Sequence, residues 1–188
     1  EWSQLPVALA KDIHIGILGT GELGLSACAI LLRHGYQVSC WSRSAKQVSG
    51  ATHYHGATEL PRLVEQADIL ISLLPLTDST KGLLNQQVLS LLPKGASVIN
   101  FSRGAIVNHQ NLVQLLDSGH IKHAVLDVFE QEPLMPSSPL WSHPKITVLP
   151  HISAPTNIKT AAQVVAANIQ RYRDSAEIPE AVDLNRGY

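Results

Sequence analysis

The sequence is poor in charged residues, in aromatic residues and in cysteine. Charged residues make up 15% and aromatic residues 5% of its 188 positions, whereas about 25% of residues are charged in a typical soluble domain. The 14 Lys and Arg nearly balance the 15 Asp and Glu, which argues against a general nucleic-acid or acidic-membrane binder. The two cysteines, Cys28 and Cys40, lie in apolar runs, so we expect free, buried thiols and a cytoplasmic protein, not a disulfide framework.

Long hydrophobic runs are also absent. The longest, residues 69–76, is interrupted by Ser72 and Pro75 and is far below the roughly 18 residues that a membrane-spanning helix needs. We therefore expect no membrane partner. Mean hydropathy is nevertheless slightly positive, at +0.07. Together with the low charge, this indicates that another domain or subunit covers part of the surface.

Short runs rich in Ile, Val and Leu alternate with segments of helical period, as in β-α-β units that build a parallel sheet. We expect strands at residues 13–18, 37–41, 69–73, 97–100, 123–126 and 146–148. We expect helices at residues 23–34, 58–66, 85–91, 108–118 and 156–173. Because the strands are almost continuously apolar, both faces of the sheet should be covered. The sequence thus predicts an α/β fold of three layers, a doubly wound parallel sheet of Rossmann type, with ligands at the carboxyl ends of the strands.

A glycine-rich string follows the first expected strand and opens the first expected helix. It reads G-T-G-E-L-G over residues 19–24 and contains Gly19, Gly21, Glu22, Leu23 and Gly24. Its glycines permit a tight turn, a close approach of the backbone to a pyrophosphate and close packing of helix on strand. The helix N-terminus supplies amide donors and a positive dipole. Since the string has a strand before it and a helix after it, dinucleotide binding is favoured over an ordinary glycine turn.

The corner after the second strand indicates which dinucleotide is bound. An NAD site would carry Asp or Glu about 20 residues beyond the glycines, to hold the ribose 2′-hydroxyl. Here residues 41–46 read W-S-R-S-A-K and contain no carboxylate. Arg43 can bond a 2′-phosphate through its planar fork, assisted by Ser42 or Ser44 and by the charge of Lys46. A solvated loop arginine is the alternative; we expect NADP(H) to be preferred, with NAD(H) possible.

Three later strand ends carry reactive side chains. Arg103, Glu132 and His151 follow the strands that end at residues 100, 126 and 148. Arginine clamps a planar carboxylate, histidine gives and takes a proton near neutral pH, and a carboxylate on the second ring nitrogen fixes the tautomer. This set suits reduction of a 2-oxo acid, with the proton coming from His151. Each residue alone is more often an ordinary loop side chain, but together, beside a dinucleotide loop, they predict an active site.

Short sequence motifs are spread over nearly the whole chain, and their combination is specific to one protein family. They include C-W-S-R-S at residues 40–44, N-F-S-R-G at 100–104, L-D-V-F at 126–129 and P-H-I at 150–152. With these strings the chain resembles the cofactor-binding domain of the D-isomer-specific 2-hydroxyacid dehydrogenases, and most closely their glyoxylate/hydroxypyruvate reductase branch. The resemblance implies that Arg103 binds the substrate, that His151 is the acid/base and that Glu132 is its carboxylate partner.

The resemblance also implies contacts around the cofactor. Asp127 and Ser153 would lie near the carboxamide end of the nicotinamide, and Leu74 and Pro75 would flank the adenosine half. The full set added in this way is Leu74, Pro75, Thr77, Phe101, Ser102, Asp127 and Ser153. Phe101-Ser102 stands where many relatives have small residues, so the packing around the nicotinamide would differ from theirs.

Other candidates have competing interpretations. Trp141 lies in a proline-rich loop at residues 132–144, where it either anchors the loop or contacts the substrate. His53 and His55 have no third ligand nearby in the sequence, so a solvated loop is favoured over a metal site. We expect no metal.

The family resemblance has consequences for the whole protein. In this family a substrate domain, on the order of a hundred residues, precedes the cofactor domain, whereas here only residues 1–12 lead into the first expected strand. We expect residues 1–188 to form one dinucleotide-binding domain with an irregular tail at 175–188, a homodimer, and poor turnover without the substrate domain. The function expected is NAD(P)H-dependent reduction of glyoxylate, hydroxypyruvate or a similar 2-oxo acid. The alternative is a dinucleotide-sensing module like the superfamily's co-repressors.

Overall fold

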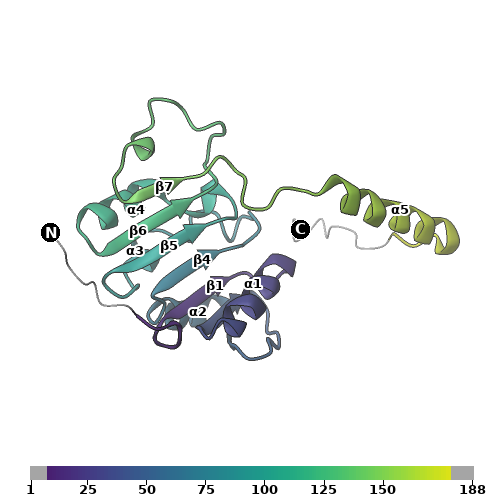
Figure 1. Ribbon diagram of the computed structural model, residues 1–188, viewed down its shortest axis with the longest axis horizontal. Helices are drawn as coiled ribbons and strands as arrows, with labels where there is room; N and C mark the ends of the chain where they lie inside the picture. Colours follow the sequence, from purple (N-terminus) through teal and green to yellow (C-terminus); the bar gives the residue numbers. More distant parts are fainter. Residues whose placement is uncertain (1–7, 179–188) are drawn as a thin grey trace. The chain divides into compact units, whose positions relative to one another are not determined.

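A computed structural model describes residues 8–178, and its strands form one parallel sheet. The order is β3-β2-β1-β4-β5-β6-β7, and each neighbouring pair is parallel (Figure 1). The strands are β1 His14–Leu18, β2 Gln37–Ser42, β3 Thr52–His55, β4 Ile69–Ser72, β5 Ala96–Asn100, β6 Ile121–Leu126 and β7 Ile146–Val148. Because the order reverses on either side of β1, the carboxyl ends of β1 and β4 meet at the topological switch point, where doubly wound sheets bind their ligands.

The helices of this sheet domain follow the expected positions. They are α1 Glu22–Arg33, α2 Gly56–Val64, α3 Gln86–Leu89 and α4 His109–Asp117, with short 3-10 helices at Ala10–Asp12, Gly104–Ile106 and Pro139–Trp141. Asn85 and Asn108 begin α3 and α4 by accepting hydrogen bonds from Val88 N (3.1 Å) and Asn111 N (3.0 Å). These side chains satisfy amides that have no partner inside the helix.

Helices pack on both faces of the sheet. On one face, Cys28 of α1 is buried against Ile17 of β1 and its apolar neighbours. On the other, α2, α3 and α4 contribute buried leucines to a larger core, among them Leu63, Leu89 and Leu116. The three layers and the doubly wound α/β fold expected from the sequence are therefore present.

The two cysteines lie in this core as free thiols, Cys28 in α1 and Cys40 in β2. Burial raises the pKa of the Cys40 thiol to about 12, and the neighbouring Cys28 adds to the effect. A thiol with so high a pKa carries almost no thiolate near neutral pH and is unreactive. The expectation of buried, unpaired cysteines is confirmed.

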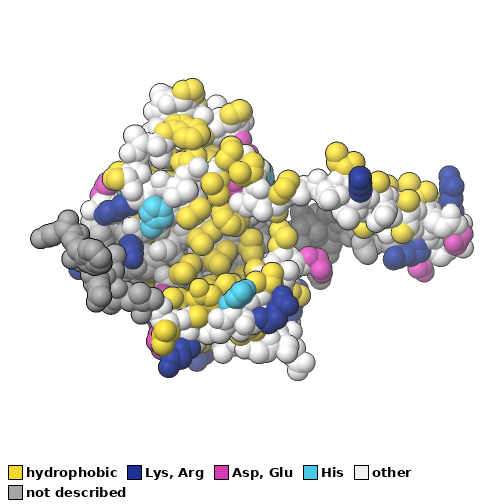
Figure 2. Space-filling view, in the orientation of Figure 1, with side chains coloured by type: hydrophobic (Ala, Val, Ile, Leu, Met, Phe, Trp, Pro, Cys, Tyr) yellow, Lys and Arg dark blue, Asp and Glu magenta, His cyan; other side chains and the backbone are white. Residues whose placement is uncertain are grey.

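One face of the sheet is covered less completely than the apolar strands predicted. Helix α1 contacts β1 and β2, and further along the same face Ile71, Ile99 and Val125 are only half-buried. Figure 2 shows hydrophobic side chains gathered over these central strands. Within residues 8–150, the contacts of α1 with the sheet are mainly with β1 and β2, so β4, β5 and β6 are less completely covered on this face than their apolar sequences predicted.

Two further differences concern short elements. His53 and His55, which we expected in a solvated loop, lie in the edge strand β3, where Ser39 pairs with Thr52 and Ser42 with His55. The prediction failed because these residues are polar and an edge strand needs only one partner. Helix α3 is four residues long, shorter than the expected 85–91, because the chain leaves the helix after Leu89 through a turn in which Leu92 N donates to Leu89 O at 3.3 Å.

The described residues divide into two compact units, within Glu1–Pro150 and His151–Tyr188. The second contains α5, Ile158–Ser175, whose N-terminus is capped by Asn157 accepting from Lys159 N and Thr160 N. Helix α5 has no buried residue, and Ile158 is 83% exposed. None of the helices between residues 8 and 178 combines the length and apolar character needed to cross a bilayer. The expected irregular tail falls largely on residues 179–188, outside the described part.

Candidate functional site

The glycine string forms the turn between β1 and α1. Gly19 has φ +109°, and a Cβ there would lie 2.7 Å from Leu73 O; its amide donates to Trp41 O at 2.8 Å. A Cβ on Gly24 would lie only 1.9 Å from Gly19 O. A side chain is therefore excluded at both positions, at the first by backbone conformation and at the second by the close packing of α1 on the turn.

The middle of the string is open. A Cβ on Gly21 would meet nothing within 4 Å, and no side chain caps the amides of α1. Glu22 and Leu23 in the first turn are exposed. Uncapped amides at a helix N-terminus, approached over a residue without a side chain, are suited to a pyrophosphate. The loop thus fits a dinucleotide.

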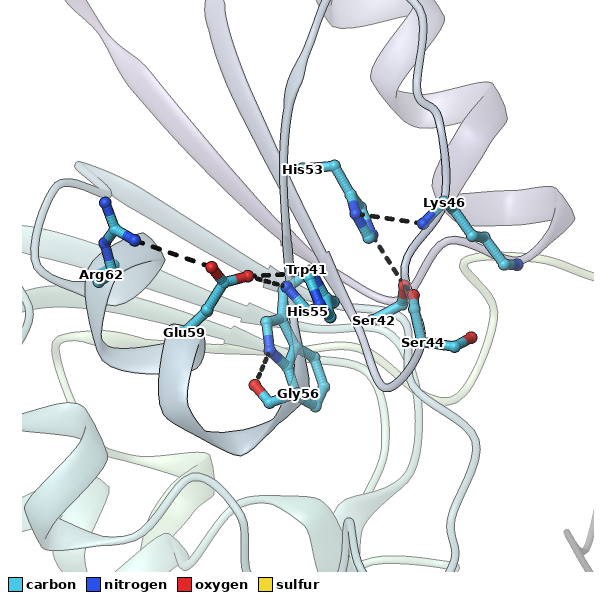
Figure 3. Close-up of polar contacts among 9 residues, drawn as sticks. All are labelled: Trp41, Ser42, Ser44, Lys46, His53, His55, Gly56, Glu59 and Arg62. Atoms are coloured by element: carbon cyan, nitrogen blue, oxygen red, sulfur yellow. Dashed lines mark hydrogen bonds and ion pairs between the residues drawn. The ribbon is translucent and has the colours of Figure 1, made fainter.

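A hydrogen-bonded cluster occupies the corner after β2 (Figure 3). Ser42 is nearly buried, and its hydroxyl donates to Ser44 O at 2.8 Å and contacts His53 Nε2 at 2.8 Å. The amide of Lys46 donates to His53 Nδ1 at 3.4 Å, and Lys46 Nζ donates to Thr20 O at 3.0 Å. Lys46 therefore ties the corner to the glycine string. Sequence analysis singled out Ser42, Ser44 and Lys46 but not the part that His53 plays.

Arg43 is exposed at this corner, between Ser42 and Ser44. Trp41, the last hydrophobic residue of β2, is buried, and its indole Nε1 donates to Gly56 O at 2.8 Å. This bond fixes the end of β2 against the start of α2. The corner therefore presents a cationic side chain from a firmly packed strand end.

The loop after β4 is held by a residue that sequence analysis missed. Thr80 Oγ1 donates to Pro75 O at 2.7 Å and accepts from Thr77 N at 2.8 Å. Leu74 is buried in the core, so its side chain packs inside and its backbone remains for contact with a ligand. Thr80 could not be identified from the sequence because a threonine in a loop carries no pattern of its own.

The strand end that carries Arg103 is fixed by a buried network. Asn100 Oδ1 accepts from Ser102 Oγ at 2.6 Å and from Ser102 N at 3.2 Å, and Ser72 Oγ lies 2.8 Å from Ser102 Oγ. Asn100 Nδ2 in turn donates to Arg103 O at 3.1 Å. The Ser102 hydroxyl is committed to this network, so the expected contact with the cofactor would come from its backbone. Phe101 beside it is half-buried.

Arg103 is exposed, and its Nη1 donates to Ser102 O at 2.7 Å. The next residue, Gly104, packs directly against the backbone of Phe129 and Glu130. A Cβ on Gly104 would lie 1.9 Å from the Phe129 carbonyl carbon and 2.3 Å from Glu130 N. In that segment Glu132 Oε1 accepts from Phe129 N at 2.8 Å. Gly104 thus joins the arginine loop to the segment of Glu132, a contact between distant residues with no local sequence signal.

Two more predicted residues lie on or after β6. Asp127 is buried directly after the strand, and its amide donates to Asn100 O at 3.1 Å. Trp141 is half exposed, and its Nε1 donates to Met135 O at 3.0 Å. That bond supports the role of loop anchor, while the substrate contact stays a prediction. Among residues 8–178 no group of three His, Cys, Asp or Glu could hold a metal ion.

His151 and Ser153 belong to the second unit, which begins directly after Pro150. The backbone of His151 has φ +54°, in the left-handed region that costs a non-glycine residue about 1–3 kcal/mol. Such conformations concentrate at functional sites. The grouping of His151 with Arg103 and Glu132 stays a prediction.

Comparison with known proteins gives one consistent family. The family described as "D-isomer specific 2-hydroxyacid dehydrogenase, NAD binding domain" matches residues 1–153. A D-isomer specific 2-hydroxyacid dehydrogenase from Xanthobacter autotrophicus, solved with NADPH and MES, is 41% identical, with TM-score 0.96 over 100% of this chain and 77% of that chain. An NADPH-dependent glyoxylate/hydroxypyruvate reductase from Sinorhizobium meliloti, solved with NADP and sulfate, is 34% identical, with TM-score 0.95 over 100% of this chain and 61% of that chain.

A third similar structure is a D-isomer specific 2-hydroxyacid dehydrogenase family protein from Klebsiella pneumoniae. It is 41% identical, with TM-score 0.91 over 97% of this chain. The match covers 59% of the Klebsiella chain, so this chain spans only part of the length of its relatives. The family match and the shared fold agree with each other. The chain belongs to the D-isomer specific 2-hydroxyacid dehydrogenase family and corresponds to its NAD-binding domain.

Proposed function

We propose that the chain is the cofactor-binding part of an NADP(H)-dependent reductase that converts a small 2-oxo acid, such as glyoxylate or hydroxypyruvate, to the 2-hydroxy acid. The observation that carries the proposal is the corner after β2. There Ser42, Arg43 and Lys46 stand where an NAD site has a carboxylate, and Lys46 Nζ bonds the glycine string at Thr20 O. The proteins solved with NADPH or NADP among the similar structures support the same cofactor.

The chain's own residues would divide the work as follows. When bound, the cofactor supplies the hydride that reduces the carbonyl carbon. Arg103 clamps the substrate carboxylate, with its guanidinium steadied by Ser102 O. His151 gives a proton to the carbonyl oxygen, and Glu132 accepts from its second ring nitrogen and so fixes the tautomer.

The remaining roles concern cofactor and substrate position. Gly21 and the first turn of α1 hold the pyrophosphate, and Leu74 contributes its backbone to the adenosine half. Trp141 lies beside the substrate. The other proposed cofactor contacts are Gly19, Glu22, Leu23, Gly24, Pro75, Thr77, Phe101, Ser102, Asp127 and Ser153. A homodimer in the cytoplasm is part of the proposal, supported by the buried free thiols and the half-covered sheet face.

Cofactor oxidation tests the proposed reaction. We expect a longer form that includes a preceding substrate domain to oxidise NADPH with glyoxylate or hydroxypyruvate, with pyruvate as a comparison. Residues 1–188 alone should bind NADPH but turn over at least about 100-fold more slowly, because the substrate domain would exclude water and hold the substrate. If the longer form binds NADPH, reduces none of these acids and captures a partner protein, the dinucleotide-sensing module is the correct reading instead.

A double substitution tests the cofactor preference. We expect Ser42→Asp with Arg43→Ala to reverse the ratio of the dissociation constants for NADP+ and NAD+. The new carboxylate would repel a 2′-phosphate and accept from a 2′-hydroxyl. Fluorescence titration with both nucleotides measures the ratio. A ratio equal to that of the unchanged protein would refute the assignment of this corner.

A further inference from the structure

His53 is the residue of the β2 corner to which neither the sequence nor the proposed function gives a role. It lies in the edge strand β3, with its Nε2 2.8 Å from Ser42 Oγ and its Nδ1 3.4 Å from the amide nitrogen of Lys46 (Figure 3). The imidazole therefore bridges two of the residues proposed to hold the adenosine 2′-phosphate. Its position rests on strand pairing, since Cys40 of β2 is its partner across the sheet.

The hydrogen bonds determine where the proton of this imidazole lies. The Ser42 hydroxyl has one hydrogen, which it donates to Ser44 O at 2.8 Å, so Nε2 of His53 must be the donor toward Ser42 Oγ. The amide of Lys46 can only donate, so Nδ1 must accept. His53 is thus neutral, with its hydrogen on Nε2 and a lone pair on Nδ1.

The charged groups around His53 maintain the neutral form. Burial lowers its pKa most, followed by the charge of His55; Glu59 raises the pKa and Lys46 lowers it. The two imidazoles are parallel, with ring centroids 6.4 Å apart, and His55 Nδ1 lies 3.1 Å from Glu59 Oε2. Protonation of the His53 imidazole is therefore disfavoured unless an anion is bound nearby.

A 2′-phosphate would reverse this balance. A phosphate monoester carries about −1.5 to −2 charges at pH 7. A phosphate oxygen that takes the Ser42 hydroxyl hydrogen away from Ser44 O would be two hydrogen bonds away from His53 Nε2. We propose that His53 is a specificity-determining residue for the adenosine 2′-phosphate, which holds Ser42 in place and takes up a solvent proton on Nδ1 when the phosphate binds. The inference rests on the proposed NADP(H) preference and adds to it a residue and a pH dependence.

Protonation of His53 Nδ1 also changes which hydrogen-bond donors at the β2 corner are available to the phosphate. Once Nδ1 carries a hydrogen it no longer accepts from Lys46 N, and at 3.4 Å that hydrogen bond is weak. The amide of Lys46 is then available to donate to a phosphate oxygen. His53 in the complex has a higher pKa than in the free chain. The affinity that it contributes is therefore fully present below the free-chain pKa and is lost as the pH rises through the pKa of the complex.

Calorimetry of the full 188-residue chain tests this inference. NADP+ and NAD+ are titrated between about pH 6 and pH 8, each in two buffers with different ionisation enthalpies, which gives the number of protons bound. We expect NADP+ binding to take up protons near neutral pH and the ratio of the two dissociation constants to grow as the pH falls. In His53→Gln, the Kd for NADP+ at about pH 6 should rise roughly five- to tenfold, since the charge-assisted hydrogen bond from His53 to Ser42 is lost, with NAD+ changed less than about twofold.

Two controls separate His53 from other titrating groups. The 2′-phosphate itself titrates near about pH 6. The free nucleotide is the same in every titration, so the difference between the unchanged chain and His53→Gln comes from His53 and its coupling to the bound phosphate. His55→Gln is the matched substitution, because the His55 imidazole is parallel to that of His53 and its Nδ1 contacts Glu59 instead of Ser42. It should keep the proton uptake, with the pKa of His53 raised because the charge of His55 is gone. Circular dichroism checks that each variant is folded.

The outcomes are distinct. Equal proton uptake and an equal affinity ratio in His53→Gln would overturn the inference, as would a parallel loss of both nucleotides, which indicates a purely structural residue. If the unchanged chain binds NADP+ and NAD+ equally, the proposed cofactor preference fails and the inference fails with it. If it prefers NADP+ with no dependence on His53, the proposed function stands and only the inference is lost.

Discussion

Gly21 and Gly24 lie in the same string but have opposite surroundings. A Cβ on Gly24 would overlap Gly19 O at 1.9 Å, whereas a Cβ on Gly21 meets nothing within 4 Å. We expect Gly24→Ala to lower the free energy of unfolding by about 2 kcal/mol or more, since backbone must move. Gly21→Ala should fold normally but raise the Kd for NADP+ at least about tenfold, because its methyl lies where the pyrophosphate approaches. Urea unfolding and fluorescence titration measure both; equal stability of the two variants would contradict this contrast.

His109 gives the stability of the fold a pH dependence. It lies at the start of α4, with its ring 6.0 Å from that of Phe129 and its Nε2 buried without a hydrogen-bond partner among the described residues. Burial lowers its pKa below the ordinary 6.5, and Glu130 opposes the shift. The unfolded chain therefore binds a proton more readily, so stability is fully present above pH 6.5 and falls as the pH falls toward the folded pKa.

A pair of substitutions isolates this effect. Replacing the imidazole in His109→Leu removes the group that must become protonated on unfolding, so the loss of unfolding free energy on acidification should be smaller. Urea unfolding at several pH values below and above 6.5 measures the slope. His34→Leu is the control, because His34 is exposed and its removal should leave the slope nearly as it is. An unchanged slope in His109→Leu would rule the assignment out.

At the scale of elements, the sequence predicted what apolar periodicity and glycine stops encode. Helix α4 was expected at 108–118 and lies at His109–Asp117, and β7 was expected and found at Ile146–Val148. Strand β3 was missed because its polar residues gain their structure from pairing with β2, which no local pattern shows. The residues of the candidate site likewise fall into those that local sequence patterns predict and those that they do not. The glycine string and Arg103 follow from spacing, whereas Gly104 and His53 act through contacts with residues distant in sequence.

The cap of α4 allows a test at this scale. Asn108 Oδ1 accepts from Asn111 N at 3.0 Å, and α4 packs Leu112 and Leu116 into the core. We expect Asn108→Ala to lower the free energy of unfolding by about 1 kcal/mol, the usual cost of losing such a cap. Asn108→Asp keeps an acceptor at the positive end of the helix and should cost less. Thermal unfolding of the two variants compares them; equal losses would show that the cap does not stabilise α4.

At the scale of the whole molecule, the low content of charged residues and the half-covered sheet face both favour a surface that a partner covers. Only 15% of the residues are charged, and Ile71, Ile99 and Val125 form a half-buried row across β4, β5 and β6 on the face where α1 packs. Contiguous apolar patches on soluble domains mark surfaces that a partner covers. Most soluble oligomers are symmetric dimers, in which the same patch serves both subunits.

We therefore expect the 188-residue chain to sediment as a dimer at micromolar concentrations. Ile99→Lys places a charge in the centre of the half-buried row and should shift the chain to monomers, because an unpaired charge is costly to bury in an interface. Met135→Lys is the matched control, since Met135 is 51% exposed and lies in the proline-rich loop, not in the strands that carry this row. It should leave the dimer intact. Analytical ultracentrifugation measures the shift, and circular dichroism confirms that both variants are folded. A monomeric unchanged chain would contradict the dimer, and a dimeric Ile99→Lys would place its interface elsewhere.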